Sequence, residues 1–355
     1  MMDKEKRNII LAGLAIGIIA VGLVVLGNPA NMGFCIACFI RDIAGAVGIH
    51  RAAPVQYIRP EIVGLVLGAF FMSIGSKEFK TRGNSSPVTR FVIGFFVTIG
   101  ALVFLGCPFR MILRLAGGDL NALIGLAGFA AGIAVGMVFL KKGYSLERTY
   151  KLPKQEGYIF PLIQVVLFIL LVTAPAFIFF TEAGKGPGGA HAPIYISLAA
   201  GLIVGVLAQR TRMCMIGGIR DIMLFKEGKL LVGFIAVFVS ALIMNIVTKK
   251  FNLGFEGQPI AHTDALWNFL GLSVVGFGST LLGGCPLRQL IMAGEGNSDS
   301  VITVLGLFVG AAFAHNFSLA ASGEGVPLNG KIAVIIALVV LFAIAAINTK
   351  KIKSK

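Results

Sequence analysis

Ten apolar stretches, each close to the length that crosses a lipid bilayer, set the strongest limit on how this chain folds. A transmembrane helix needs about 20 mainly apolar residues, because its backbone polar groups must pair within the segment. The stretches are residues 9–27, 57–76, 90–106, 119–140, 158–181, 194–209, 230–248, 265–283, 300–317 and 331–348. The sequence therefore predicts an all-α polytopic membrane protein with about ten transmembrane helices.

The composition agrees with a membrane protein and excludes a soluble domain or a disordered chain. Of the 355 residues, 57% are apolar and only 13% are charged. Soluble domains carry about 45–50% apolar and about 25% charged residues. The segments between the spans are short, so we expect no separate soluble catalytic domain. The bilayer is the expected surrounding of nearly the whole chain.

The basic residues are distributed unevenly between the two sides that alternating spans define. The side of the N-terminus receives 22 Lys and Arg residues, and the other side receives 9. Cytoplasmic loops of membrane proteins are enriched in Lys and Arg. We therefore expect a multi-pass protein of the inner (plasma) membrane with both termini cytoplasmic, 141–157 inside and 182–193 outside. This asymmetry accounts for much of the net charge of +15 without a nucleic-acid partner.

Two different motifs occur twice at nearly equal spacing. Residues 33–43 (GFCIACFIRDI) match residues 212–222 (RMCMIGGIRDI), and GCPFR at 106–110 matches GCPLR at 284–288. The cysteines of the two motifs are 72 residues apart in the first case and 71 in the second. Such agreement is hard to obtain by chance, so the chain contains an internal repeat.

The number of spans in each half predicts how the halves are related. Residues 1–181 and 194–355 each contain five spans, and a Gly- and Pro-rich linker at 182–193 joins them. Because five is odd, the second half must enter the membrane from the opposite side. Inverted repeats of this kind are typical of secondary transporters, whose substrate site lies at the repeat interface near the bilayer midplane.

The repeated cysteines stand in four segments that are too short to cross the membrane. Cys107 and Cys285 each precede a Pro, which favours the first position of a helix because its missing N–H would be unpaired there. The predicted short helices are re-entrant or discontinuous and lie at 108–116, at 286–293, and within 31–46 and 211–225. A helix N-terminus attracts anions and lowers the pKa of a thiol. The starts of 108–116 and 286–293 are therefore candidate anion sites.

An arginine accompanies each of the four cysteines. An Arg at membrane depth costs several kcal/mol unless it is paired or hydrated. Arg110 and Arg288 have no adjacent acid, so we expect them to attract an anion. Arg41 and Arg220 are each followed by an Asp, and both an ion pair that braces the turn and an anion site stay open for them. The candidate substrate-binding residues are Cys35, Cys107, Cys214, Cys285, Arg41, Arg110, Arg220 and Arg288.

The fifth cysteine, Cys38, breaks the repeat because Gly217 stands at the equivalent position. The Cys35-x-x-Cys38 spacing is compatible with a redox pair or with half of a metal site. The chain has no second CxxC motif, no HxxxH motif and only four His residues. We therefore expect no metal site and no cofactor.

The paired Cys motifs resemble those of the YeeE/YedE family of sulfur-transport membrane proteins, and its selenium-metabolism branch is the most similar. The resemblance spans residues 9–348 and centres on Cys35, Cys107, Cys214 and Cys285. It implies thiosulfate uptake through a positively charged, hourglass-shaped protein with thiols along the path, and a small cytosolic sulfur-carrier protein as partner. Thiosulfate-type members have Thr or Ser after the second-motif Cys, whereas this chain has Cys-Pro-x-Arg. The resemblance therefore leaves a selenium oxyanion open as an alternative substrate.

We expect an inner-membrane permease, not an enzyme, that imports a small sulfur- or selenium-containing anion through a central constriction lined by thiols and Arg side chains. The anion would meet the cysteines of the first half before those of the second. Thiols are weak, soft donors, and conduction requires weak binding at several sites. Two alternatives stay open: a membrane thiol–disulfide oxidoreductase that uses Cys35 and Cys38, and a non-transporting scaffold for selenium metabolism.

Overall fold

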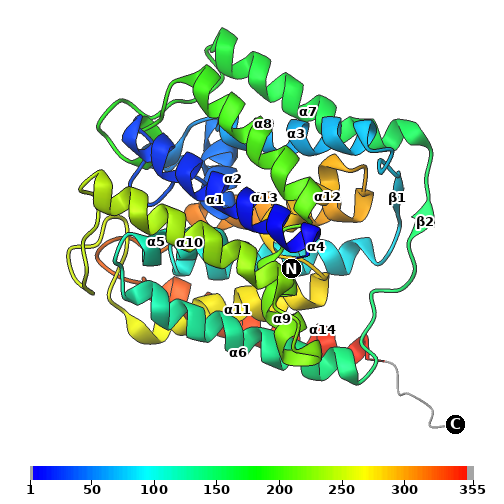
Figure 1. Cartoon of the computed structure of the whole chain (residues 1–355). Helices are drawn as coiled ribbons and strands as arrows, with labels where there is room; N and C mark the ends of the chain where they lie inside the picture. The colour runs from blue at the N-terminus through cyan, green and yellow to red at the C-terminus, as the bar shows by residue number, and fades with distance from the viewer. Residues whose placement is uncertain (1–2, 350–355) are drawn as a thin grey trace, which may run out of the picture.

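The computed structural model describes residues 3–349, which form a bundle of α-helices (Figure 1). The helices are α1 (Lys4–Val25), α2 (Ile36–Ala46), α3 (Pro60–Gly75), α4 (Pro87–Val103), α5 (Pro108–Ala116), α6 (Asn121–Lys141), α7 (Lys154–Thr173), α8 (Ile194–Thr211), α9 (Met215–Phe225), α10 (Lys229–Val247), α11 (Ala265–Leu282), α12 (Pro286–Gly294), α13 (Ser298–Asn316) and α14 (Leu328–Ile347). Two short strands, β1 (Arg82–Gly83) and β2 (Tyr150–Lys151), pair antiparallel. The predicted all-α polytopic fold is confirmed.

Ten segments of residues 3–349 are long and apolar enough to cross a membrane, as the sequence predicts. The fifth predicted span, 158–181, is wrong in its end, because α7 stops at Thr173. Ala174 adopts the left-handed conformation with φ 42°, and Pro175 follows. Left-handed backbone ends a helix, and Pro cannot continue one. The ninth span begins at Ser298, and its N-cap is Asn297, whose side chain accepts a hydrogen bond from the N–H of Ser300.

The ends of the helices gather at two opposite faces of the bundle. The face that we call the basic face holds the starts of α1 and α10, which are connected by the ion pair of Lys229 with Glu5. The opposite face, called the linker face, holds the end of α1 and the start of α8, where Ala192 N–H donates to Asn28 at 2.8 Å. Four residues of the predicted basic excess, Lys350, Lys351, Lys353 and Lys355, lie outside the described residues.

The helices of the first half pack against those of the second half in reciprocal pairs. Helix α3 packs along α8 and α10 along α1, while α6 packs along α11 and α13 along α4. Glycine makes these contacts close. A Cβ added at Gly128 of α6 would lie 2.0 Å from the Phe269 oxygen, and one at Gly276 of α11 would lie 2.2 Å from the Phe129 oxygen. Small residues therefore bring the backbones of α6 and α11 into contact.

Helices α7 and α14 depart from the reciprocal pattern. Helix α7 packs on α3 and α12, whereas α14 packs on α4 and α11. Both helices leave much of their surface unburied within the described chain. The reciprocal packing is thus confined to the twelve inner helices.

Four short helices begin in the interior of the bundle. Helices α2, α5, α9 and α12 occupy the predicted segments, and the cysteine before each belongs to the hydrophobic core. Helices α4 and α5 are two parts of an interrupted span, since Leu105 between them has φ 61°. Helices α11 and α12 are interrupted in the same way at Gly283, with φ 77°. The fold therefore places helix N-termini at its centre.

Candidate functional site

Each of the four repeated cysteines is the N-cap of a short helix. Cys35 precedes α2, Cys107 precedes α5, Cys214 precedes α9 and Cys285 precedes α12, all with extended backbone. The predicted N-cap position of Cys107 and Cys285, with Pro at the first helical residue, is confirmed. The same role for Cys35 and Cys214 was not predicted, because neither is followed by Pro. All four thiols therefore lie where a helix dipole is positive.

The first two of these cysteines meet in a linker-side cluster, which we define as Cys35, Cys38, Cys107 and Arg110. The backbone N–H of Ile36 donates to the Sγ of Cys107 at 3.3 Å, so the start of α2 faces the start of α5. The N–H of Cys38 donates to the Sγ of Cys35 at 3.4 Å. All three thiols are exposed by 1% or less. Two helix N-termini therefore converge on a closed group of thiols.

Arg110 is fully buried in the linker-side cluster, and no carboxylate within residues 3–349 forms an ion pair with it. Its Nη1 group donates to the Leu105 carbonyl oxygen and, at 3.8 Å, to the Sγ of Cys38. Its Nη2 group donates to the Ile260 carbonyl oxygen at 3.2 Å. Its Nε has no hydrogen-bond partner. A buried cation without a counter-ion is costly, and a small anion would neutralise it.

The other two cysteines meet in a basic-side cluster, which we define as Cys214, Cys285 and Arg288. The N–H of Gly217 donates to the Sγ of Cys214 at 3.5 Å. The Cys214 and Cys285 thiols are neighbours, and the start of α9 approaches Cys285. This arrangement repeats that of the linker-side cluster. Cys214 is 7% exposed and Cys285 3%, so this cluster is also closed.

Arg288 is not the free cation that the sequence predicts. Its Nη1 and Nη2 groups donate to Oε1 and Oε2 of Glu295 at 3.0 and 3.3 Å. No acid is adjacent to Arg288 in the sequence, but residues seven positions apart share a helix face after two turns. The equivalent position after Arg110 is Gly117, ten residues beyond the cysteine in each half. The two clusters therefore differ in charge, because only the basic-side Arg is compensated.

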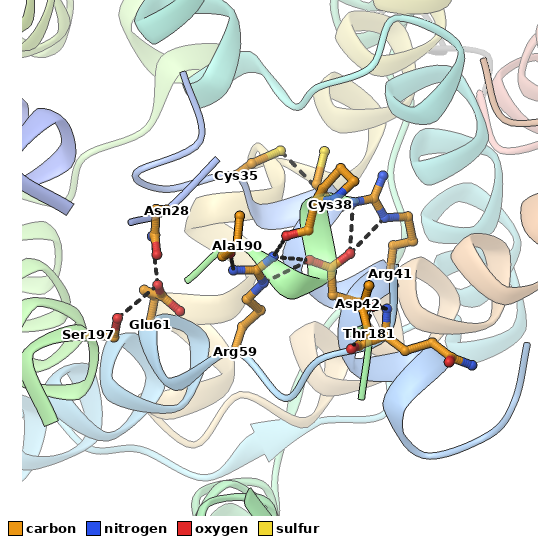
Figure 2. A network of polar contacts seen from close by, with 12 residues as sticks. Asn28, Cys35, Cys38, Arg41, Asp42, Arg59, Glu61, Thr181, Ala190 and Ser197 are labelled. Carbon is orange, nitrogen blue, oxygen red and sulfur yellow. Dashed lines mark hydrogen bonds and ion pairs between the residues drawn. The ribbon is translucent and has the colours of Figure 1, made fainter. Parts of the chain in front are cut away.

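Arg41 is paired within a buried network on α2 (Figure 2). Its Nε and Nη2 groups donate to Oδ1 of Asp42 at 2.9 and 2.7 Å, and the Nε of Arg59 donates to Oδ2 at 2.7 Å. Arg59 also donates to the carbonyl oxygens of Pro187 and Ala190 in the linker. This geometry favours the ion-pair interpretation of Arg41. Arg59 is not among the residues that the sequence predicts, because its cation has no local partner and its acid lies 17 residues away.

Arg220 forms the same local pair as Arg41 but in a more open setting. Its Nε group donates to Oδ1 of Asp221 at 3.0 Å, and its Nη2 group forms an ion pair with the same oxygen at 2.9 Å. The Arg220 side chain is 34% exposed, whereas Arg41 is 4% exposed. The ion-pair interpretation is therefore favoured here as well, and water screens this pair more strongly.

A polar cavity of about 200 Å³ lies at the basic face beside the basic-side cluster. Its lining residues are Lys77, Glu78, Lys80, Arg82, Arg212, Arg288, Glu295 and Asn297. Five cations against two carboxylates leave this cavity positive. Arg288 belongs both to the lining of this cavity and to the basic-side cluster.

Comparison with known proteins points to sulfur transport. Residues 210–351 match the family model described as sulphur transport, and this region contains Cys214 and Cys285. The thiosulfate transporter TsuA of Spirochaeta thermophila is 30% identical over 118 residues. That alignment covers 33% of this chain and 35% of the relative, so the chain matches about a third of its length. The predicted resemblance to the YeeE/YedE sulfur-transport family is confirmed.

Proposed function

From the match of residues 210–351 to the sulphur-transport family, we propose that this chain is an inner-membrane permease for a small sulfur-containing anion. The anion is thiosulfate or a species like it, and it moves from the linker face to the basic face. It binds first at the linker-side cluster and then at the basic-side cluster. The protein moves the anion without changing its covalent structure.

The structural observation that carries this proposal is the environment of the Arg110 side chain. A buried guanidinium without a carboxylate meets three thiols and two helix N-termini in one place. The guanidinium and the helix N-termini favour negative charge. The thiols are soft, weakly bonding groups that suit a polarisable sulfur atom. These groups together match an anion that carries both oxygen atoms and an exposed sulfur.

The charge difference between the clusters gives the path a direction. At the linker-side cluster no carboxylate of the described residues pairs with Arg110, so the anion supplies its counter-charge. At the basic-side cluster the anion competes with Glu295 for Arg288. Conduction requires binding that is weak enough for release. We infer that the linker-side cluster captures the anion and that the basic-side cluster releases it into the positive cavity.

The packing supports two inverted repeats, at 1–181 and 194–355, with the linker at 182–193. The inner helices contact one another in reciprocal pairs, as a two-fold relation requires. The turns after α5 and α12 also correspond. Gly118 has φ 97° and Gly296 has φ 90°. The side-chain oxygen of the residue after each Gly accepts a hydrogen bond from a backbone N–H at the start of the next helix.

The same proposal assigns the sides and the partner. The excess of Lys and Arg supports a cytoplasmic basic face, with both termini on that side. A small cytosolic sulfur-carrier protein would then receive the anion at the basic cavity. The Cys-Pro-x-Arg motif leaves a selenium oxyanion as an alternative substrate. In that alternative the protein serves selenium metabolism.

Uptake by vesicles that contain the purified protein tests the proposal. Radiolabelled thiosulfate should accumulate faster than in empty vesicles, and unlabelled selenite should be tested as a competitor. Sulfate is the matched control, because it has the same charge and similar shape but no exposed sulfur. We expect sulfate to compete much more weakly than thiosulfate. Thiosulfate uptake equal to that of empty vesicles would contradict a permease.

The oxidoreductase alternative is favoured only by the proximity of Cys35 and Cys38, where the N–H of Cys38 reaches the Cys35 Sγ at 3.4 Å. Trapping of thiols in cells should find both cysteines reduced during uptake if the protein is a permease. A Cys35–Cys38 disulfide that forms and disappears with activity would support the alternative. A scaffold for selenium metabolism would instead tolerate loss of all four repeated cysteines.

A further inference from the structure

Glu61, in the first turn of α3, is a buried carboxyl group without a cation. Four carboxylates are buried within residues 3–349, and Asp42, Asp119 and Asp299 each form an ion pair with an arginine. Glu61 is 0% exposed and forms none. The mechanism proposed above does not use this group.

The two oxygens of Glu61 are in different situations (Figure 2). Oε1 accepts hydrogen bonds from Nδ2 of Asn28 at 2.7 Å and from Oγ of Ser197 at 3.1 Å. Oε2 is buried and has no hydrogen-bond partner. An ionised carboxylate is very costly at such a place, whereas a protonated carboxyl group costs far less. Oε2 is therefore the oxygen of Glu61 that is free to bind a proton.

The titratable groups near Glu61 lead toward the linker face. The buried hydroxyl group of Tyr57, four residues before Glu61, also lacks a hydrogen-bond partner. The Tyr57 ring stacks on His191 at 4.3 Å, and His191 is exposed. Arg59 is bound to Asp42 and to the linker and is not free to pair with Glu61. The Tyr57–His191 stack therefore extends from the segment before α3 to the surface of the linker.

The helices packed on α3 bring no other cation to Glu61. Helix α8 faces it with Ser197, and the charged residues of α7 and α8 lie toward the basic face. Helix α12 packs on α3 at Val66 and Ala69, more than one turn away. The charged residues of α2 are Arg41 and Asp42, which pair with each other.

Asn28 links Glu61 to the linker-side cluster. Its Nδ2 group donates both to Glu61 and, at 3.4 Å, to the carbonyl oxygen of Gly33, two residues before Cys35. Its Oδ1 accepts from the N–H of Ala192 in the linker. Loss of the proton from Glu61 would strengthen its hold on Asn28 and so change the segment that leads to Cys35.

We propose that Glu61 is the proton site that couples uptake of the sulfur anion to inward movement of protons, an inference that rests on the proposed function. An inside-negative membrane potential opposes the inflow of an anion, and a proton that moves with it offsets one charge. In each cycle a proton from the linker face binds to Oε2, forming one O–H bond. The same bond breaks when the proton leaves toward the basic face.

Vesicles that contain the protein, labelled thiosulfate outside and a pH-sensitive dye inside test this coupling. With the outside more acidic than the inside, wild-type uptake should rise severalfold, and thiosulfate should acidify the interior. Glu61→Gln mimics the protonated carboxyl group but cannot release a proton. It should lose the response to the pH gradient and the acidification while still equilibrating thiosulfate down its own gradient. Glu61→Asp should keep both responses.

Ser197→Ala is the matched control, because it removes one hydrogen bond to Oε1 and leaves the carboxyl group in place. It should remain coupled to protons. Wild-type uptake that neither responds to the pH gradient nor acidifies the interior would overturn the inference and leave the permease intact. A gradient response in Glu61→Gln would also overturn it. No thiosulfate uptake under any condition would refute the permease and the coupling together. If Glu61→Gln fails to fold, the wild-type dye measurement and Glu61→Asp decide.

Discussion

At the scale of single residues, function depends on which buried charges are compensated. Arg110 and Arg114 lie one turn apart on α5, and both are fully buried. Arg114 is paired with Asp119 at 2.6 Å, whereas no acid within residues 3–349 pairs with Arg110. The two side chains are therefore a natural matched pair. The same chemical change should affect folding at one position and transport at the other.

Arg110→Gln should reduce thiosulfate uptake more than tenfold and leave the protein folded, because it removes a cation that has no buried acid to strand. Arg114→Gln should leave Asp119 unpaired and destabilise the fold by about 3–5 kcal/mol. Uptake by vesicles measures the first effect, and thermal unfolding in detergent measures the second. Equal effects of both variants on unfolding would refute this division of roles.

The cysteines at positions 107 and 285 give a second prediction at this scale. Cys107→Ala and Cys285→Ala should each abolish or severely cut uptake, because Ala keeps the small size and the N-cap backbone and removes only the sulfur. Ser279→Ala is a suitable control, since this buried hydroxyl group in α11 has no hydrogen-bond partner. Labelled thiosulfate uptake, normalised to folded protein, is the measurement. Wild-type uptake by the Cys107→Ala, Cys285→Ala double variant would contradict a role for the thiols.

At the scale of elements, α5 and α12 are equivalent short helices with different electrostatics. Both begin at a Cys-Pro pair and carry an Arg three residues after the Cys. Ten residues after the Cys stands Gly117 in one and Glu295 in the other. The sequence predicts the helices well, because Gly-Cys-Pro is a local signal. It did not reveal the Arg288–Glu295 pair, although a spacing of seven residues on one helix face is a signal that could have found it.

Glu295→Gln should free Arg288 and tighten anion binding at the basic-side cluster. A partly exposed ion pair is worth about 0.2–1 kcal/mol, so the apparent KM should fall by a factor of about 1.4 to 5. Release should slow, which lowers the maximal rate. Initial rates of thiosulfate uptake at several concentrations separate the two effects. An unchanged KM together with an unchanged maximal rate would show that Glu295 does not compete with the anion.

At the scale of the whole molecule, the sequence predicts the spans but not the contacts between distant segments. Apolar runs determine where helices cross, and the packing of α3 on α8 or of α6 on α11 follows only from the folded chain. Two contacts are of this second kind: the hydrogen bond from the Ile36 N–H to the Cys107 Sγ across 71 positions, and the ion pair of Arg59 with Asp42. A repeat in the sequence predicts equivalence between sites, whereas the partners of each buried charge depend on tertiary structure.

The sidedness of the molecule is the prediction on which the direction of transport depends. The native cysteines are all buried, so a cysteine introduced at the surface should react selectively with a membrane-impermeant maleimide. Lys185 lies in the linker and Arg148 lies in 141–157, and both side chains are exposed. The variants are Lys185→Cys and Arg148→Cys. Intact cells should label Lys185→Cys, and Arg148→Cys should react only after the membrane is opened. Each variant serves as the control for the other. The reverse pattern would place the basic face outside. The linker-side cluster would then capture the anion from the cytoplasm, and the protein would export it.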